Sequence, residues 1–335
     1  MPIASALYFT KEHICANKKE APDVLAEQAA HCLELVAELV REGLDFTFKG
    51  GNSLLVLLEE PRRFSIDVDI ATDETRERID QTVEGVVKKH GLFTRFQKRQ
   101  HKTKPWLPMV SYEIFYASHF TDNKENFIML DAILKKNTTP KIRKKVACGG
   151  LYQCNETVEL PTISSIIGDK LLTLGPRTLG IPLGKNKEAQ RLKHGHDVAL
   201  LAEQPLDLDE IRQSVAACMK QELEIQEKTM TEEEVLADTL SFCVQPFRYA
   251  EKPVDQGLNP ALSEIVRGHV PFAEHLFSRD YSWQRLQKDL ARAALCLTAA
   301  VVKTVTNSQF KQALAYNDAA AYWKQTVLWW EKDPE

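Results

Sequence analysis

Residues 49–72 read KGGNSLLVLLEEPRRFSIDVDIAT, and two aspartates one residue apart, Asp67 and Asp69, interrupt what is otherwise a β-strand pattern. Aspartate is disfavoured in strands, and a buried carboxylate is costly unless it is paired or bound to a metal. Residues two apart in a strand share a face, so both carboxylates lie side by side, about 7 Å apart at their Cα atoms. A divalent cation between them removes their repulsion, and Mg²⁺ is commonly held by one or two carboxylates plus substrate phosphates. The alternative is a pair of exposed aspartates on a solvated strand face.

A glycine turn precedes this strand. The segment KGGNS (49–53) leaves a short predicted strand, DFTFKGG (45–51), and opens a short predicted helix, NSLLVLLEE (52–60). Glycines let a backbone approach a ligand closely, and N–H groups at a helix start can bind phosphate. An ordinary tight turn would also explain a Gly-Gly pair taken alone. Followed by the paired aspartates, however, the turn predicts that triphosphate and metal meet at one end of a sheet.

The remaining pattern predicts two domains. Residues 1–160 form an α/β domain, with amphipathic helices over 21–44 and 73–91 and neighbouring antiparallel strands over 92–100, 107–117 and 126–134. A further strand is expected within 147–160. Residues 161–335 are expected to be all helical.

Composition indicates a cytoplasmic protein. Hydrophobic residues make up 44% of the chain and charged residues 27%, which is ordinary for a globular protein. The net charge of −4 gives no overall attraction to nucleic acid or to an anionic membrane. The start of the chain lacks the apolar core of a signal peptide. The longest apolar stretch, 292–303, is shorter than the ~20 residues of a membrane span. The seven cysteines lack zinc-ligand spacing and are expected to be reduced thiols.

These residues resemble a known signature. GGNSL followed by RFSIDVDI is similar to the polymerase-β-type nucleotidyltransferases, and more narrowly to the AbiEii/AbiGii-type toxin nucleotidyltransferases. The matching positions are Gly50, Gly51, Leu54, Arg63, Ser65, Asp67 and Asp69. The resemblance implies an α+β fold: a polymerase-β-like core, a mixed sheet with flanking helices, followed by an all-helical C-terminal domain.

The resemblance continues downstream to about residue 200. IIGDKLLTLGPRTLGIP resembles the family's Asp-Lys segment, with Asp169 and Lys170 on a helix, and RLKHGHDVALL resembles its Arg-x-Lys-Asp-x-x-Asp motif. His194 stands where the family usually has aspartate. The resemblance implies that Lys170 contacts the nucleotide phosphates and that Asp197 orients Lys170 or a nucleotide group. The helical domain would thus contribute both to the active-site cleft.

A third carboxylate is expected on a neighbouring strand. Asp131 interrupts the apolar segment FIMLDAIL. In related nucleotidyltransferases the third acid, on a neighbouring strand, acts as a base or second metal ligand. Glu113 is the rival candidate for this role, and Asp131 could alternatively be a polar residue at a strand end. His194 and His196 do not share a helix face, which disfavours a metal site there. The predicted nucleotide-binding residues are Gly50, Gly51, Asn52, Ser53, Arg63, Ser65, Arg191 and Lys193.

The predicted reaction is Mg²⁺-dependent transfer of a nucleoside monophosphate from an NTP to an acceptor hydroxyl, with one or two metal ions. Two acid-free basic clusters, 95–104 and 135–145, would form one positive surface for RNA. Their members are Arg95, Lys98, Arg99, Lys102, Lys104, Lys135, Lys136, Lys141, Arg143, Lys144 and Lys145. The resemblance favours the 3′ acceptor end of tRNA and a toxin with a cognate antitoxin, in a toxin–antitoxin or abortive-infection system. A protein or small-molecule acceptor, and a non-catalytic binding protein, are the alternatives.

Overall fold

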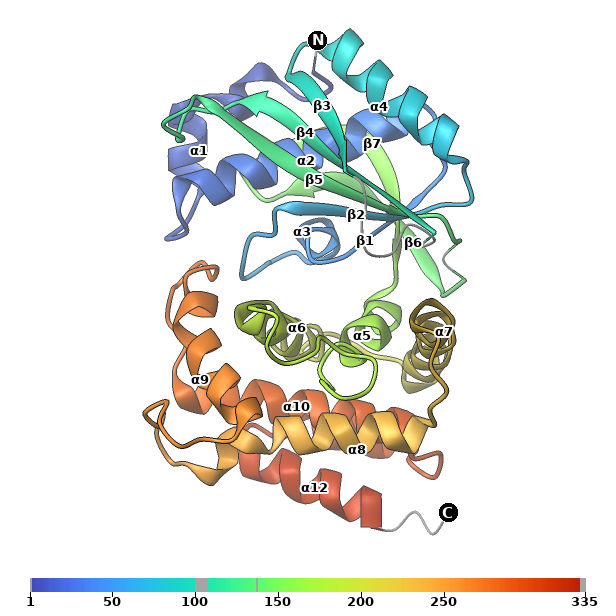
Figure 1. Cartoon of the computed structure of the whole chain (residues 1–335), viewed down its shortest axis with the longest axis vertical. Helices are drawn as coiled ribbons and strands as arrows, with labels where there is room; N and C mark the ends of the chain where they lie inside the picture. Colours follow the sequence, from blue (N-terminus) through green and yellow to red (C-terminus); the bar gives the residue numbers. More distant parts are fainter. Residues whose placement is uncertain (1, 100–107, 137, 332–335) are drawn as a thin grey trace. The chain divides into compact units, whose positions relative to one another are not determined.

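The computed structural model describes residues 2–99, 108–136 and 138–331, which divide into two compact units (Figure 1). Unit 1 comprises Met1–Pro161 and His275–Arg279, and unit 2 comprises Thr162–Glu274 and Asp280–Glu335. The predicted boundary was residue 160, and the sequence did not indicate that the short segment His275–Arg279 belongs with unit 1.

Unit 1 is built on a sheet whose described part has seven strands, in the order β3-β4-β5-β2-β1-β7-β6. The strands are β1 Thr47–Lys49, β2 Asp67–Ala71, β3 Phe93–Arg99, β4 Met109–Ala117, β5 Glu125–Ile133, β6 Lys141–Cys148 and β7 Tyr152–Pro161. The sheet is mixed: β2 runs parallel to β5, and β1 runs parallel to β7 but antiparallel to β2. The helices of this unit are η1 Ala6–Phe9, α1 Lys11–Asn17, α2 Asp23–Arg41, α3 Ser53–Leu57 and α4 Arg76–His90.

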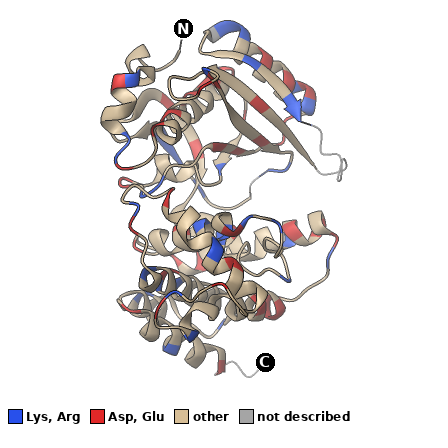
Figure 2. Ribbon diagram, turned by 60° about the vertical axis from the view of Figure 1, so that its left-hand side comes forward, with Lys and Arg blue, Asp and Glu red and all other residues tan. Residues whose placement is uncertain are grey.

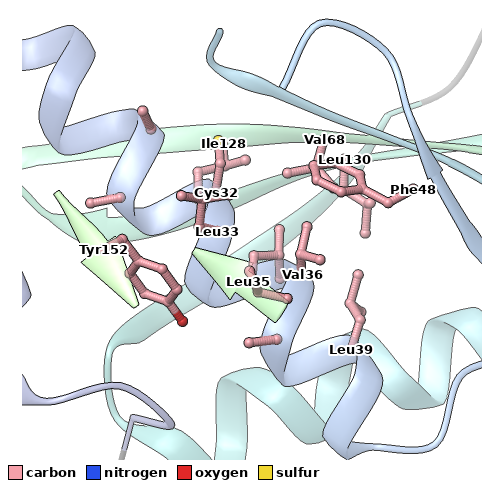
Figure 3. Packing of buried hydrophobic residues seen from close by; sticks show 14 of the residues in the cluster. Cys32, Leu33, Leu35, Val36, Leu39, Phe48, Val68, Ile128, Leu130 and Tyr152 are labelled. Carbon is pink, nitrogen blue, oxygen red and sulfur yellow. The ribbon is translucent and has the colours of Figure 1, made fainter. Parts of the chain in front are cut away.

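The core of unit 1 lies between α2, α4 and one face of the sheet. Leu35, Val36 and Leu39 of α2 pack against Phe48 and Val68 of the central strands, as Figure 3 shows. The alternation predicted around Asp67 and Asp69 accounts for this packing, because Val68, which lies between them, points to the buried side of the sheet. α4 ends at Gly91, whose φ of 74° closes the helix in the left-handed conformation.

Unit 2 is helical throughout its described part, as predicted. Its helices are α5 Ile163–Leu171, α6 Glu188–Leu201, α7 Leu208–Gln226, α8 Glu232–Cys243, η2 Gln245–Arg248, α9 Pro260–Ala273, α10 Trp283–Val301, α11 Asn307–Leu314 and α12 Ala319–Glu331. α10 is the central helix and packs against α6, α7, α8 and α12. Together with the mixed sheet of unit 1, this confirms the predicted fold class.

The structure adds one strand that the sequence did not indicate. The basic segment 135–145, predicted to bind RNA, runs into the edge strand β6, Lys141–Cys148. The strand expected within 147–160 is β7, and a turn at Gly149–Gly150 joins it to β6 in a hairpin. Lysines on an exposed edge strand discourage pairing with other chains, so a basic segment is compatible with an edge strand.

No helix in the described ranges is both long enough and apolar enough to cross a membrane.

The His275–Arg279 segment is fixed to unit 1 by backbone contacts. The Phe277 N–H donates to the Arg62 carbonyl (2.9 Å), and the Phe277 carbonyl accepts from the Glu20 N–H (3.1 Å). The Phe277 ring also packs on Phe64, with 4.5 Å between ring centroids. The segment therefore supports the stretch that leads into β2.

A buried glutamate on α2, Glu38, makes the stability of unit 1 depend on pH. Glu34 accepts hydrogen bonds from the Tyr152 hydroxyl (2.6 Å) and the Ile3 N–H (2.5 Å). Burial and the neighbouring Glu34 raise the pKa of Glu38 to about 8, although Arg41 lies 2.8 Å away. Glu38 therefore keeps its proton in the folded chain at neutral pH.

We expect Glu38→Gln to flatten the pH dependence of the free energy of unfolding. The pKa of a glutamate in the unfolded chain is about 4.3. The raised pKa of Glu38 therefore stabilises the folded chain in full below about pH 4.3, and this stabilisation is lost as pH rises through about 8. Between pH 5.5 and 8.5 the wild type should lose roughly 2–4 kcal/mol that the variant does not lose. Urea unfolding at both pH values measures this, with Glu84→Gln as an exposed control. Equal pH slopes for wild type and Glu38→Gln would contradict the assignment.

Candidate active site

The paired aspartates lie on the face of β2 that points away from α2. Val68 and Ile70 are fully buried, whereas Asp67 is exposed and Asp69 half-buried. The predicted alternation is therefore present, although the strand begins at Asp67 and not at Ser65.

Asp131 is the carboxylate beside this pair. In the parallel pairing of β2 with β5, Asp69 lies directly opposite Asp131, so both side chains share a face of the sheet. Asp131 accepts a hydrogen bond from the Ser111 hydroxyl on β4, a contact that the sequence did not indicate. Its rival Glu113 lies on β4, one strand farther from β2, and forms an ion pair with Arg99 (3.6 Å). The sheet thus aligns Asp67, Asp69 and Asp131.

The glycine turn packs directly on this acidic face. Gly50 has φ = +70°, and a Cβ atom there would lie 1.8 Å from Oδ2 of Asp69. At Gly51 a Cβ would meet Ser65 Oγ at 2.7 Å and Arg63 Nη2 at 2.8 Å. Both glycines are therefore required by close approach, Gly50 to Asp69 and Gly51 to Arg63 and Ser65.

Asn52 and Ser53 complete the turn, and both side chains are buried. The Ser53 hydroxyl donates to the Gly50 carbonyl (2.8 Å), which shapes the turn. The Asn52 amide is fully buried, and within the described part of the chain neither its oxygen nor its nitrogen has a hydrogen-bond partner. Such a buried polar group calls for a ligand or ordered water. The Cys32 thiol lies nearby, and burial raises its pKa, with the Asp67 charge adding to the effect.

The donor set fits a hard divalent cation completed by its substrate. Among the described residues, no group of three or more His, Cys, Asp or Glu side chains is placed to hold a metal ion by itself. Mg²⁺ is usually bound by one or two carboxylates, with phosphate oxygens and water as the other ligands. Aspartates aligned on neighbouring strands, beside a turn whose backbone has no room for a side chain, meet that requirement.

We expect Gly50→Ala to reduce catalysis far more than its backbone strain alone would. The new methyl would displace the Asp69 carboxylate, and a misplacement of about 1 Å can cost ~10²-fold in rate. Gly91→Ala is the matched control, because φ there is +74° and nothing lies within 4 Å of the added carbon. Both variants should lose similar stability in thermal melts, and only Gly50→Ala should lose activity. Equal activity in the two variants would refute the packing argument.

In unit 2, a buried ion pair joins Lys170 on α5 to Asp197 on α6. Lys170 Nζ lies 2.7 Å from Oδ2 of Asp197, and both side chains are almost completely buried. The two residues singled out by the resemblance are therefore in direct contact. The contact with Asp197 holds the Lys170 amino group at a fixed position.

Arg191, predicted to face phosphate, has other partners. Its guanidinium is buried, pairs with Glu264 on α9 (2.5 Å) and donates to the Ile181 carbonyl. We therefore assign Arg191 to holding unit 2 together. Lys193 and His194 are half-buried on α6, and His196 bonds through Nδ1 to Asp289 on α10 (2.7 Å).

The basic clusters are largely matched with acids. Ion pairs join Lys98 to Asp80 (2.8 Å) and Lys136 to Asp73 (3.8 Å). Further pairs are Arg95–Glu125, Arg99–Glu113 and Lys141–Glu159. The Lys144 ammonium donates to the Leu57 carbonyl, Arg143 and Lys145 are exposed on β6, and Lys135 is half-buried. Lys102 and Lys104 lie outside the described residues.

The sheet order also separates the two clusters. β3 carries the first and β6 the second, and these are opposite edges of the sheet. At about 4.8 Å per strand, they lie roughly 29 Å apart along the sheet. The strand-borne parts of the clusters therefore do not form the single surface that was predicted. In Figure 2 both signs of charge are interspersed along the ribbon.

The fold and the aligned carboxylates define a nucleotidyltransferase-type site, and comparison with known proteins agrees. A family model described as nucleotidyl transferase AbiEii toxin, type IV toxin–antitoxin system, matches residues 34–294. The chain belongs to this family of nucleotidyltransferase toxins.

One solved structure supports the fold, and a second shows a weaker similarity. MenT4, a nucleotidyltransferase toxin from Mycobacterium tuberculosis H37Rv, is 14% identical with a TM-score of 0.50, and the match covers 91% of this chain and 98% of MenT4. An antigenic nucleotidyltransferase-like protein from Paracoccidioides brasiliensis is 14% identical with a TM-score of 0.37, covering 62% of this chain and 95% of that one. A sequence search among curated proteins gives no match.

Proposed function

We propose that the chain is a Mg²⁺-dependent toxin nucleotidyltransferase that transfers a nucleoside monophosphate from an NTP to a hydroxyl of RNA, the 3′ acceptor end of tRNA. The observation that carries this proposal is the alignment of Asp67, Asp69 and Asp131 beside the Gly50–Gly51 turn. The tRNA acceptor is what the family resemblance implies.

The reaction needs positioning and charge compensation more than covalent help from the protein. The acceptor oxygen attacks the α-phosphorus, the bond from that phosphorus to the bridging oxygen breaks, and pyrophosphate leaves. Magnesium, when bound by Asp67 and Asp69, would polarise the phosphate oxygens. Asp131, held by Ser111, would take the proton of the attacking hydroxyl.

The remaining residues would bind the nucleotide. The Gly50–Gly51 backbone and the Asn52 amide would face the β- and γ-phosphates, with Arg63 and Ser65 supporting the turn. In this proposal Lys170, held in place by Asp197, compensates the charge of the leaving pyrophosphate.

Partners and compartment follow from the same proposal. A toxin of this family would have a cognate antitoxin, and an NTP would be its co-substrate. All seven cysteines are free thiols, which fits the reducing cytoplasm.

Label transfer tests the proposal. The purified chain is incubated with Mg²⁺, total tRNA and each α-labelled NTP in turn, beside Asp67→Ala and Lys170→Ala. Label on RNA that both variants lose would support the proposal and identify the nucleotide. Label on a protein or small molecule of a lysate, with none on RNA, would overturn the acceptor assignment and favour the alternative transferase.

A further inference from the structure

The connection between α5 and α6 is a long loop that carries only positive charge. Residues 172–187, hereafter the basic loop, read LTLGPRTLGIPLGKNK and contain Arg177, Lys185 and Lys187 but no aspartate or glutamate. Connections longer than about 12–15 residues are uncommon in compact units and are usually functional. This one begins directly after the helix that carries Lys170.

Two buried carboxylates fix the backbone of the basic loop. Asp238 on α8 accepts from the N–H groups of Arg177 (2.7 Å) and Thr178 (2.9 Å) and from the Thr178 hydroxyl (3.0 Å). Glu264 on α9 accepts from the Gly184 N–H. The loop is therefore held by acids that are themselves buried, at 8% and 3% exposure.

The loop is also closed on itself and tied to α5. The Ile181 N–H donates to the Thr173 carbonyl (3.1 Å), and the Thr173 hydroxyl donates to the Lys170 carbonyl (2.7 Å). A Cβ at Gly180 would lie 2.5 Å from the carbonyl oxygens of Gly175 and Thr173, so the turn has no room for a side chain. The position of the loop is thus coupled to the helix of Lys170.

The cations of this loop are left to solvent. Arg177, Lys185 and Lys187 are exposed, and within the described ranges none has an ion pair or a side-chain hydrogen bond. The nearby acids Asp238 and Glu264 bind backbone N–H groups instead. By contrast, the cations of β3 each lie within 4 Å of an acid, which offsets their charge.

We infer that the basic loop is the contact surface for the sugar–phosphate backbone of the nucleic-acid acceptor; this inference rests on the proposed function. Exposed cations on a fixed backbone suit a polyanion, because each phosphate contact releases counterions and a rigid loop loses little entropy on binding. An NTP alone would need an enclosed pocket. Contacts of this kind position an RNA without reading its sequence.

RNA binding at several salt concentrations tests the inference. Fluorescence anisotropy with labelled total tRNA, without NTP, compares the wild type with the triple variant Arg177→Gln/Lys185→Gln/Lys187→Gln. The matched control is Arg95→Gln/Lys98→Gln/Arg99→Gln, which removes the same number of charges from β3. The loop variant should bind roughly 10–100-fold more weakly at 0.1 M salt, with the slope of log K against log salt shallower by about 2–3. The β3 variant should retain most of the wild-type affinity.

A second variant separates loop geometry from net charge. Asp238→Ala makes the chain less negative, so a purely electrostatic effect would strengthen RNA binding. The inference predicts weaker binding, because the loop loses its anchoring carboxylate. A thermal melt first verifies that each variant is folded.

Unchanged affinity and slope in the loop variant, or equal losses in the loop and β3 variants, would overturn the inference. Its failure is distinguishable from failure of the proposed function. If label moves to RNA and the loop variant binds like wild type, only the interface is wrong. If the loop variant loses tRNA affinity but the wild type transfers no label to RNA, the interface stands and the acceptor assignment falls.

Discussion

Asp69→Asn should lower the rate of nucleotidyl transfer by at least ~10³-fold while leaving the chain folded. The substitution keeps the shape of the side chain, so the packing of Gly50 against it is retained. What is lost is the negative charge that, together with Asp67, would hold Mg²⁺ against the triphosphate. Asparagine is a weak neutral ligand and cannot replace a carboxylate in that position.

Single-turnover label transfer at saturating Mg²⁺ measures this effect, with circular dichroism to verify the fold. Asp122→Asn is the matched control, because that aspartate is exposed in the turn between β4 and β5. Asp69→Glu should also fail, since Gly50 leaves no space for a longer side chain. Activity of Asp69→Asn within tenfold of wild type would exclude metal binding by this pair as the basis of catalysis.

The sequence was sufficient for the features that depend on local pattern. The alternation around Asp67 and Asp69 predicted which face of β2 is buried, and the amphipathic pattern over 73–91 predicted α4. The ordered motifs predicted the family and hence the fold. Each of these depends on residues close together in the chain.

Features that depend on distant partners were not predictable in the same way. Ser111 and Asp131 are brought together by strand pairing, and Arg191 meets Glu264 across 73 residues of chain. A single sequence gives no signal for either contact, because serines and glutamates at such spacing are common. The basic residues of β3 illustrate the same limit: their acid partners come from α4 and from the neighbouring strands.

The contact between Lys170 and Asp197 leads to the second large expected effect. Lys170→Met should cost about 3–5 kcal/mol in the free energy of unfolding, because it removes the cationic partner of a carboxylate in the interior of unit 2. Asp197→Leu should cost a similar amount by isolating the lysine. Both single variants should also lose transferase activity.

The double variant Lys170→Met/Asp197→Leu separates structure from chemistry. Replacing both members of a buried pair with apolar residues of similar volume is often neutral for stability, so most of the lost free energy should return. Activity should not return, because no amino group remains to compensate phosphate charge. Urea unfolding and label transfer on the four proteins form a double-mutant cycle for each property. If activity recovered together with stability, the ion pair would only be holding α5 against α6, and Lys170 would have no part in binding the nucleotide.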